Sequence, residues 1–175
     1  MKIEAASRLM AVRIAREGAY SDAQGLEDLE NLTWVLNKKP KIFIGKNKND
    51  FSFWWVKNQQ FLVCVKDEKA CGFIEFYRGL KTVYVDNDTK PIRGMQISVT
   101  FMAPDYRGKG LMLGMHQYLI TQTNLISDDT YTPQGLTIWK QLKKMGHTIE
   151  VIDGNTQTEK SWTEPRTLML IRRGQ

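Results

Sequence analysis

Two glycines and two cations occupy four consecutive positions of this sequence, from Arg107 through Gly108 and Lys109 to Gly110. Glycine lets the backbone turn tightly and approach a ligand closely, because it carries no Cβ. If a helix follows at Leu111, its first N–H groups point outward with the positive end of the helix dipole, which attracts phosphate oxygens. Arg107 and Lys109 add full positive charge. The segment therefore predicts a pyrophosphate-binding loop, although it matches neither the P-loop spacing nor G-x-G-x-x-G.

A strand and a helix must hold this loop in place. Apolar residues stand at every second position from Met95 to Phe101, which predicts a half-buried strand with those side chains on one face. Residues 110–122 have helical spacing, so that Leu111, Met115 and Leu119 share a face. The order predicted around the loop is thus strand, basic glycine turn, helix.

Elsewhere, helical and extended patterns alternate along the chain. Ser21 and Gln24 have the spacing of a capping box, which predicts a helix that begins there and ends before Pro40. Its inward face would carry Leu26, Leu29, Leu32 and Leu36. Two more helices are predicted at residues 3–16 and 133–145, the second begun by Thr132 and Pro133. Strands are predicted at 61–65, 70–77, 125–127, 149–152 and 167–171.

The loop sequence resembles motif A of the GCN5-related N-acetyltransferase superfamily, [Arg/Gln]-x-x-Gly-x-[Gly/Ala]. Residues 107–112 follow that pattern until the last position, where Met112 replaces the usual glycine or alanine. The resemblance implies that the loop binds the pyrophosphate of acetyl-coenzyme A, through Arg107, Gly108, Lys109, Gly110, Leu111 and Met112. It also implies that the pantetheine arm lies along Phe101 and Met102.

The same resemblance implies the transfer of an acetyl group to a primary amine. Such a reaction needs a neutral amine, a stabilised carbonyl oxygen and a proton for the departing thiolate. The Met102 amide would bind the carbonyl oxygen. A base is often a carboxylate on the motif strand, but this strand has none, so the candidate catalytic carboxylates are Glu75, Asp128 and Asp129. Trp139 stands where the family usually has a proton-donating tyrosine, which leaves Tyr131 as the nearby candidate.

The predicted fold is a single α/β (α+β) domain over residues 1–175. The order of elements is similar to that of the superfamily. The resemblance implies a mixed central sheet of about six to seven strands flanked by about four helices, consistent with one layered core.

The formal net charge of +6 suits a phosphate-bearing partner, either a nucleotide cofactor or a nucleic acid. Lysines also flank an aromatic cluster at Phe51, Phe53, Trp54 and Trp55, which either packs in the core or stacks on bases. An acyltransferase or binding module directed to nucleic acid therefore stays open as one alternative. A binding protein that keeps the fold without catalysis is the other, because of Met112, Trp139 and the missing carboxylate on the motif strand. The acceptor, a small molecule or a protein amine, is undetermined, and so is homodimer formation.

Cysteine and histidine usage argues against a metal site, because no Cys/His cluster has ligand spacing. The predicted hairpin would place Cys64 opposite Cys71. We expect both thiols to be reduced, in a cytoplasmic protein. No apolar run approaches the roughly 20 residues of a membrane-spanning helix.

Overall fold

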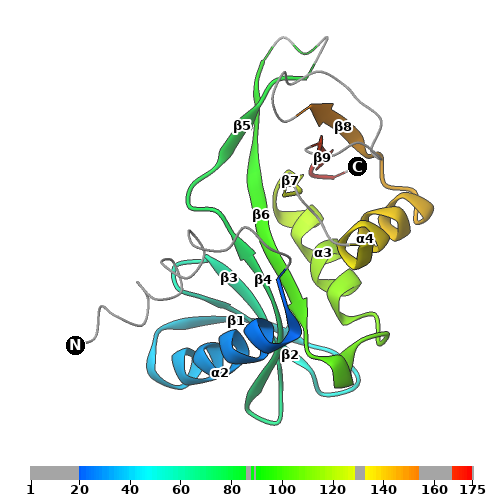
Figure 1. Cartoon of the computed structure of the whole chain (residues 1–175). Coiled ribbons are helices and arrows are strands. Elements are labelled where there is room, and N and C mark those ends of the chain that lie inside the picture. Colours follow the sequence, from blue (N-terminus) through cyan, green and yellow to red (C-terminus); the bar gives the residue numbers. More distant parts are fainter. Residues whose placement is uncertain (1–19, 86–87, 89, 129–132, 154–166, 175) are drawn as a thin grey trace.

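The computed structural model describes residues 20–85, 88, 90–128, 133–153 and 167–174. Within them lies one mixed sheet with the strand order β1-β2-β3-β4-β6-β7-β9-β8, and β5 pairs with β6 beside this path (Figure 1). The strands are β1 (Lys41–Lys46), β2 (Ser52–Val56), β3 (Phe61–Lys66), β4 (Lys69–Phe76), β5 (Lys81–Val83), β6 (Ile92–Met102), β7 (Leu125–Ile126), β8 (Glu150–Asp153) and β9 (Thr167–Ile171). The helices are α2 (Asp22–Lys38), α3 (Leu111–Gln122) and α4 (Pro133–Lys144), and Pro104–Tyr106 form a short 3₁₀ turn.

The predicted α/β class with a mixed sheet is confirmed: β6 and β7 are parallel, whereas their neighbours are antiparallel. The sheet is larger than predicted. The sequence pattern missed β1, β2 and β5, because these strands are short or carry exposed apolar residues such as Ile42 and Phe43. The predicted helix at 3–16 lies outside the described residues.

Helix α2 covers one face of the sheet, while α3 and α4 cover the other (Figure 1). The capping box of α2 is present as predicted. The Ser21 hydroxyl accepts a hydrogen bond from the Gln24 amide, and the Gln24 side chain accepts one from the Ser21 amide. Leu26 is a correction: it is 45% exposed, whereas Val35 takes the inward position. A Cβ at Gly25 would overlap the Phe101 ring, so glycine lets α2 lie directly on β6.

Two main clusters of buried side chains form the core. The α2 cluster joins that helix to Phe61, Phe73 and Phe101, and the α3 cluster joins α3 and α4 to the opposite face. In the predicted aromatic cluster, Phe51 and Trp55 are buried in the α3 cluster, which supports core packing.

The hairpin of β3 and β4 has the predicted pairing of Val65 with Ala70, but its register differs from the prediction beyond that pair. Asp67 and Glu68, both with positive φ, form a two-residue turn. Cys64 pairs with Gly72 rather than with Cys71, because a β-bulge follows Cys64. The two cysteines are nevertheless buried neighbours with free thiols, and their Sγ atoms are 3.5 Å apart.

Candidate functional site

The loop that precedes α3 has the backbone that its sequence predicts. Gly108 and Gly110 both have φ of 73°, in the left-handed region that favours glycine. A Cβ at either position would meet no other atom within 4 Å, so the loop faces open space. Gly110 is the N-cap of α3 and supplies no capping side chain. The first N–H groups of α3 therefore meet no side-chain cap and are available for an anion.

Arg107 has a different position from the one that the sequence predicts. Its Nε atom donates to the Met102 carbonyl at 2.9 Å, and its guanidinium forms an ion pair with Asp22 at the start of α2. The same group lies over the Phe101 ring, 5.7 Å from the centroid. Arg107 therefore joins the loop to β6 and α2, and in this conformation it does not extend into the open space beside the glycines.

Lys109 is the exposed cation of the loop. Its Nζ atom lies 5.0 Å from the centroid of the Tyr106 ring, which holds the ammonium group near the helix N-terminus. Leu111 is buried and anchors the first turn of α3 in the core. Met112 packs against the same cluster while half-buried, and its carbonyl accepts a hydrogen bond from His116 Nδ1 at 2.9 Å. The methionine that departs from the family pattern thus contributes to helix packing.

Strands β6 and β7 separate shortly after they meet. Their parallel ladder consists of two pairs, Met95 with Leu125 and Gln96 with Ile126. Beyond that point β6 continues to Met102, whereas the residue after β7 stays beside β9. The Ser127 amide donates to the Met169 carbonyl, and the Ser127 hydroxyl accepts from the Met169 amide. Among the described residues, the later part of β6 has a strand neighbour only in β4. Its other edge is open toward the start of α3 (Figure 1).

A β-bulge interrupts β6 at this divergence. Glu75 pairs with Val99 and Phe76 with Ile97, which leaves Ser98 without a partner in β4. The prediction that Met95, Ile97, Val99 and Phe101 share a face is therefore wrong. Met95 and Ile97 pack with the α3 cluster, whereas Val99 and Phe101 pack with the α2 cluster. A bulge adds one residue and so reverses the alternation of side chains.

Polar groups from three strands converge where β6 and β7 separate. The Tyr77 hydroxyl donates to Asp128 Oδ1 at 3.2 Å, and the Tyr77 amide donates to the Gln96 carbonyl at 3.0 Å. Gln96 Nε2 donates to the Ser127 carbonyl at 3.3 Å. We call these four residues the divergence cluster. Sequence reasoning found Asp128 but missed Tyr77, because no local pattern shows that residues 51 positions apart will meet.

The other predicted catalytic residues have separate positions. Glu75 is 8% exposed and lies opposite Phe61, on the face covered by α2. It accepts from Gln60 Nε2 at 3.4 Å. Burial lowers the pKa of the neighbouring Lys57, although the charge of Glu75 opposes that effect. Asp129 and Tyr131 lie outside the described residues, and Trp139 is buried beside His116.

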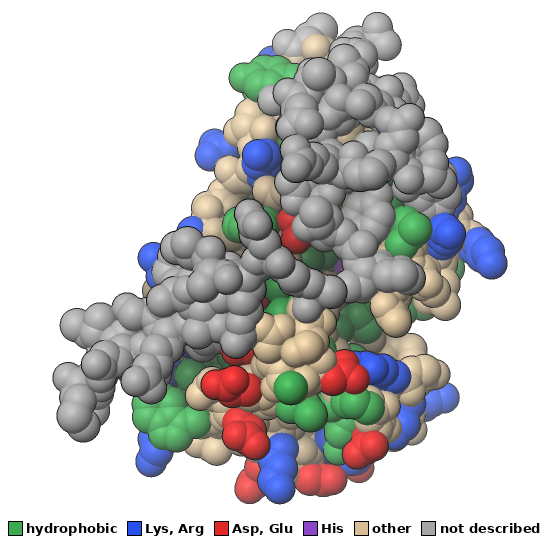
Figure 2. All heavy atoms as spheres, viewed as in Figure 1, with side chains coloured by type: hydrophobic (Ala, Val, Ile, Leu, Met, Phe, Trp, Pro, Cys, Tyr) green, Lys and Arg blue, Asp and Glu red, His purple; other side chains and the backbone are tan. Residues whose placement is uncertain are grey.

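No group of three or more His, Cys, Asp or Glu side chains among the described residues is arranged to hold a metal ion. None of the described helices combines the length and the apolar character needed to cross a membrane. Figure 2 shows acidic side chains gathered at the α2 end of one face, with Lys and Arg side chains along its sides.

No protein family model matches the chain, and no curated protein matches it in sequence. Several solved structures are similar to it in fold. Diaminobutyrate acetyltransferase EctA from Paenibacillus lautus, in complex with diaminobutyric acid and coenzyme A, is 12% identical with a TM-score of 0.41, over 65% of this chain and 70% of that one. The N-acetyltransferase YlbP of Bacillus subtilis, in complex with coenzyme A, is 9% identical with a TM-score of 0.47, over 89% and 84%.

The third structure is Naa50 of Arabidopsis thaliana in complex with the bisubstrate analogue CoA-Ac-MVNAL. It is 13% identical with a TM-score of 0.40, over 94% of this chain and 91% of that one. EctA and YlbP are acetyltransferases in complex with coenzyme A, and the Naa50 structure contains a bisubstrate analogue that includes coenzyme A. At these identities and scores, function has to be argued from the chain's own residues.

Proposed function

We propose that this protein is an acetyl-coenzyme A-dependent N-acyltransferase that acetylates a primary amine. The observation that carries the proposal is the loop of Gly108 and Gly110, which leads from the open edge of β6 to the uncapped N-terminus of α3. Helix N-termini and glycine turns bind phosphate groups through backbone N–H donors. The divergence cluster then supplies a carboxylate at the far end of the same open edge.

The described residues fit coenzyme A in a defined orientation. Its pyrophosphate would lie at Gly108–Leu111, with the Lys109 ammonium beside it, and its pantetheine arm would follow the open edge of β6 toward the divergence cluster. When bound, acetyl-coenzyme A supplies the activated acetyl group. In this arrangement Met102 lies at the pyrophosphate end. Ser98, at the bulge, lies nearer the divergence cluster, and we therefore favour its backbone amide over that of Met102 as the donor to the carbonyl oxygen.

We assign to Asp128 the removal of protons from the acceptor amine. An ammonium must lose a proton before its nitrogen can form the new C–N bond. The nitrogen loses a second proton as the C–S bond breaks, and the departing thiolate gains one. A carboxylate at the divergence cluster can accept a proton from the amine directly or through water. Tyr77 and Gln96 hold that carboxylate and its strand in position.

Calorimetric titration of coenzyme A tests the binding site. Gly110→Asp adds a side chain and a negative charge where the phosphates would lie, and we expect it to abolish binding. Gly79→Asp is the matched control, because Gly79 also has positive φ, 78°, and also faces open space, but lies in the β4–β5 connection. Equal affinity in the two variants would refute the loop assignment.

Transfer is tested separately by incubating the protein with labelled acetyl-coenzyme A and a broad panel of small-molecule and protein amines. We expect labelled product from at least one amine. If the wild-type protein binds coenzyme A but labels no amine, the non-catalytic alternative becomes the better description. The residues that motivate that alternative, Met112 and Trp139, both have packing roles in the structure.

A further inference from the structure

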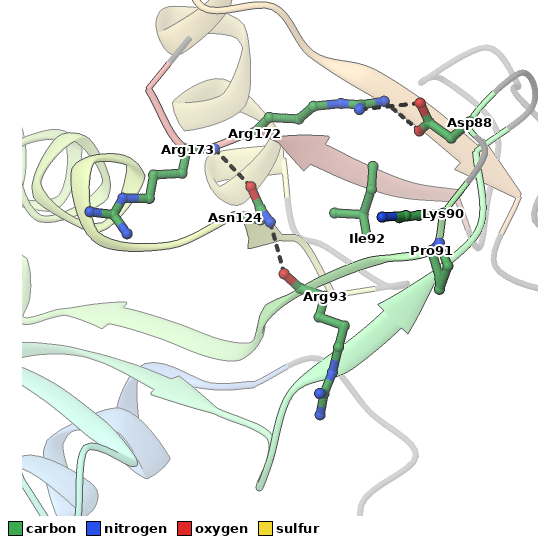
Figure 3. Close-up of a pocket in the computed structure, with 8 residues that line it drawn as sticks. All are labelled: Asp88, Lys90, Pro91, Ile92, Arg93, Asn124, Arg172 and Arg173. Carbon is green, nitrogen blue, oxygen red and sulfur yellow. Dashed lines mark hydrogen bonds and ion pairs between the residues drawn. The ribbon is translucent and has the colours of Figure 1, made fainter.

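A pocket of about 480 Å³ lies at the start of β6 (Figure 3). The loop of Gly108–Leu111, which we call the coenzyme loop, lies at the other end of this strand. Arg172 runs along one side of it toward Asp88, Asn124 forms another side, and Lys90 and Ile92 lie between them (Figure 3). The volume falls within the range of small-molecule sites, about 300–1,000 Å³. The topology explains the position, because β9 is antiparallel to β7 and so brings Arg172 back to the start of the β6–β7 pair.

Positive charge dominates this basic pocket. Four of its lining residues are cationic, Lys90, Arg93, Arg172 and Arg173. Asp88 and the adjacent Glu150 both pair with Arg172, so the group has a net charge of +2. Within the described part of the chain, Lys90 and Arg93 form no ion pair. An anion that enters the pocket would therefore meet the Lys90 ammonium, which forms no ion pair with any described carboxylate.

Hydrogen bonds fix the walls of the basic pocket. Asn124 Nδ2 donates to the Arg93 carbonyl at 2.8 Å, and Asn124 Oδ1 accepts from the Arg173 amide at 2.8 Å (Figure 3). The Arg172 guanidinium donates to Glu150 at 2.6 Å and to Asp88 at 2.7 Å, and these bonds raise the pKa of Arg172. The site is thus preorganised by contacts from β6, β8 and the segment after β9, which lowers the entropic cost of binding.

This pocket is separate from the proposed coenzyme site. Asn124 and Asp128 flank β7 at its two ends, and four extended residues span about 13 Å. The basic pocket lies at the amino end of the short β6–β7 ladder, whereas the divergence cluster lies at the carboxyl end of that ladder. The geometry points to a second anion site, which binds a small ligand that carries a phosphate group with more than one negative charge. Lys90 contacts the phosphate and Ile92 supports an apolar part, whereas the Arg93 and Arg173 side chains extend away from the pocket (Figure 3) and add only to its positive potential.

The test titrates inorganic tripolyphosphate into the full chain by calorimetry at an ionic strength of about 0.1 M, where the screening length is about 10 Å. The Gly110→Asp background removes binding at the coenzyme loop. In that background we expect one remaining binding event, weakened at least about tenfold by Lys90→Gln with Arg93→Gln, since the charge-assisted contact of Lys90 is lost together with the nearby charge of Arg93. Lys38→Gln with Lys39→Gln removes the same charge at the exposed end of α2 and should leave the affinity within about twofold, because those charges lie more than a screening length from the pocket in moderate salt.

Three results would overturn the proposal. The first is the absence of tripolyphosphate binding in Gly110→Asp, and the second is equal affinity in the two double variants. The third comes from a single-stranded RNA oligonucleotide titrated in parallel: RNA binding that depends on Lys90 and Arg93, without tripolyphosphate binding, would assign the pocket to a nucleic-acid backbone. Circular dichroism confirms that each variant is folded. Both double variants carry Gly110→Asp, so their comparison does not depend on whether the loop at Gly108–Leu111 binds coenzyme A.

Discussion

His116 should make the stability of this protein depend on pH in a way that one substitution removes. The side chain is 1% exposed on α3 and packs edge-on against Trp139. Its Nδ1–H donates to the Met112 carbonyl at 2.9 Å, which fixes the Nδ1–H tautomer of the neutral ring. Burial lowers the pKa of His116 to about 4, and the hydrogen bond to Met112 opposes this only in part. The folded protein therefore resists protonation of this ring.

The sign of the effect follows from linkage. Between pH 6.5 and 4, the unfolded chain binds a proton at His116 that the folded chain does not, so the free energy of unfolding falls as the pH falls. Above pH 6.5 neither state is protonated there, and the contribution is constant. Because each tenfold change in a protonation constant is worth about 1.4 kcal/mol, the loss at pH 5 is about 2 kcal/mol and approaches about 3 kcal/mol near pH 4.

Urea unfolding at pH 7 and pH 5 measures this contribution. In His116→Met the group is absent, so the difference between the two pH values should be about 2 kcal/mol smaller than in the wild-type protein. Comparison within each protein cancels the carboxylates, which titrate in both. His147→Gln, which removes the chain's other histidine, is the matched control for the loss of a histidine as such. If His116→Met keeps the full wild-type dependence, the buried neutral imidazole is not the cause and the reasoning fails.

Three further outcomes are expected. Arg107→Ala should lower the free energy of unfolding, measured in urea, by about 1–2 kcal/mol, because a charged hydrogen bond to Met102 is lost. It should weaken coenzyme A binding less than Gly110→Asp does. A larger loss of affinity in Arg107→Ala than in Gly110→Asp would place Arg107 on the phosphates. Asp128→Asn should lower kcat at least about tenfold with coenzyme A affinity within about threefold, and full activity would remove Asp128 from the proposed mechanism. Native mass spectrometry should show two free thiols, since the hydrogen bond to Cys71 and burial raise the pKa of Cys64 and keep it protonated; a quantitative disulfide would contradict this.

Local patterns were sufficient to predict the elements that build the loop. The capping box at Ser21, the helix from Leu111 and the turn of Gly108 and Gly110 depend on neighbours within four residues, where propensity and capping act directly. The short strand β7 was also predictable, because its apolar residues interrupt two polar segments. For these elements, local preference and tertiary packing favour the same conformation.

The β-bulge at Ser98 explains why the face of β6 was predicted wrongly. A period of two assumes that every residue pairs, and one unpaired residue reverses which cluster each later side chain joins. The same principle applies at Cys64, where a second bulge shifts the pairing by one residue. A bulge depends on the neighbouring strand rather than on the residues of its own strand, and a single sequence does not show that neighbour.

The position of the carboxylate has a structural consequence for the proposed reaction. The coenzyme loop connects β6 to α3, whereas Asp128 follows β7. The neighbouring Ser127 hydroxyl accepts a hydrogen bond from the Met169 amide in β9. Two ladder pairs and the hydrogen bond from Gln96 to the Ser127 carbonyl connect these halves near the cluster. The separation between carboxylate and thioester would therefore be set by a short junction, and the contact of Tyr77 with Asp128 adds a third connection from β4. The sequence offers no carboxylate on the motif strand, which made Asp128 a candidate base. In this fold the neighbouring strand can provide it, because the two strands separate at the point where a carbonyl and an amine would meet.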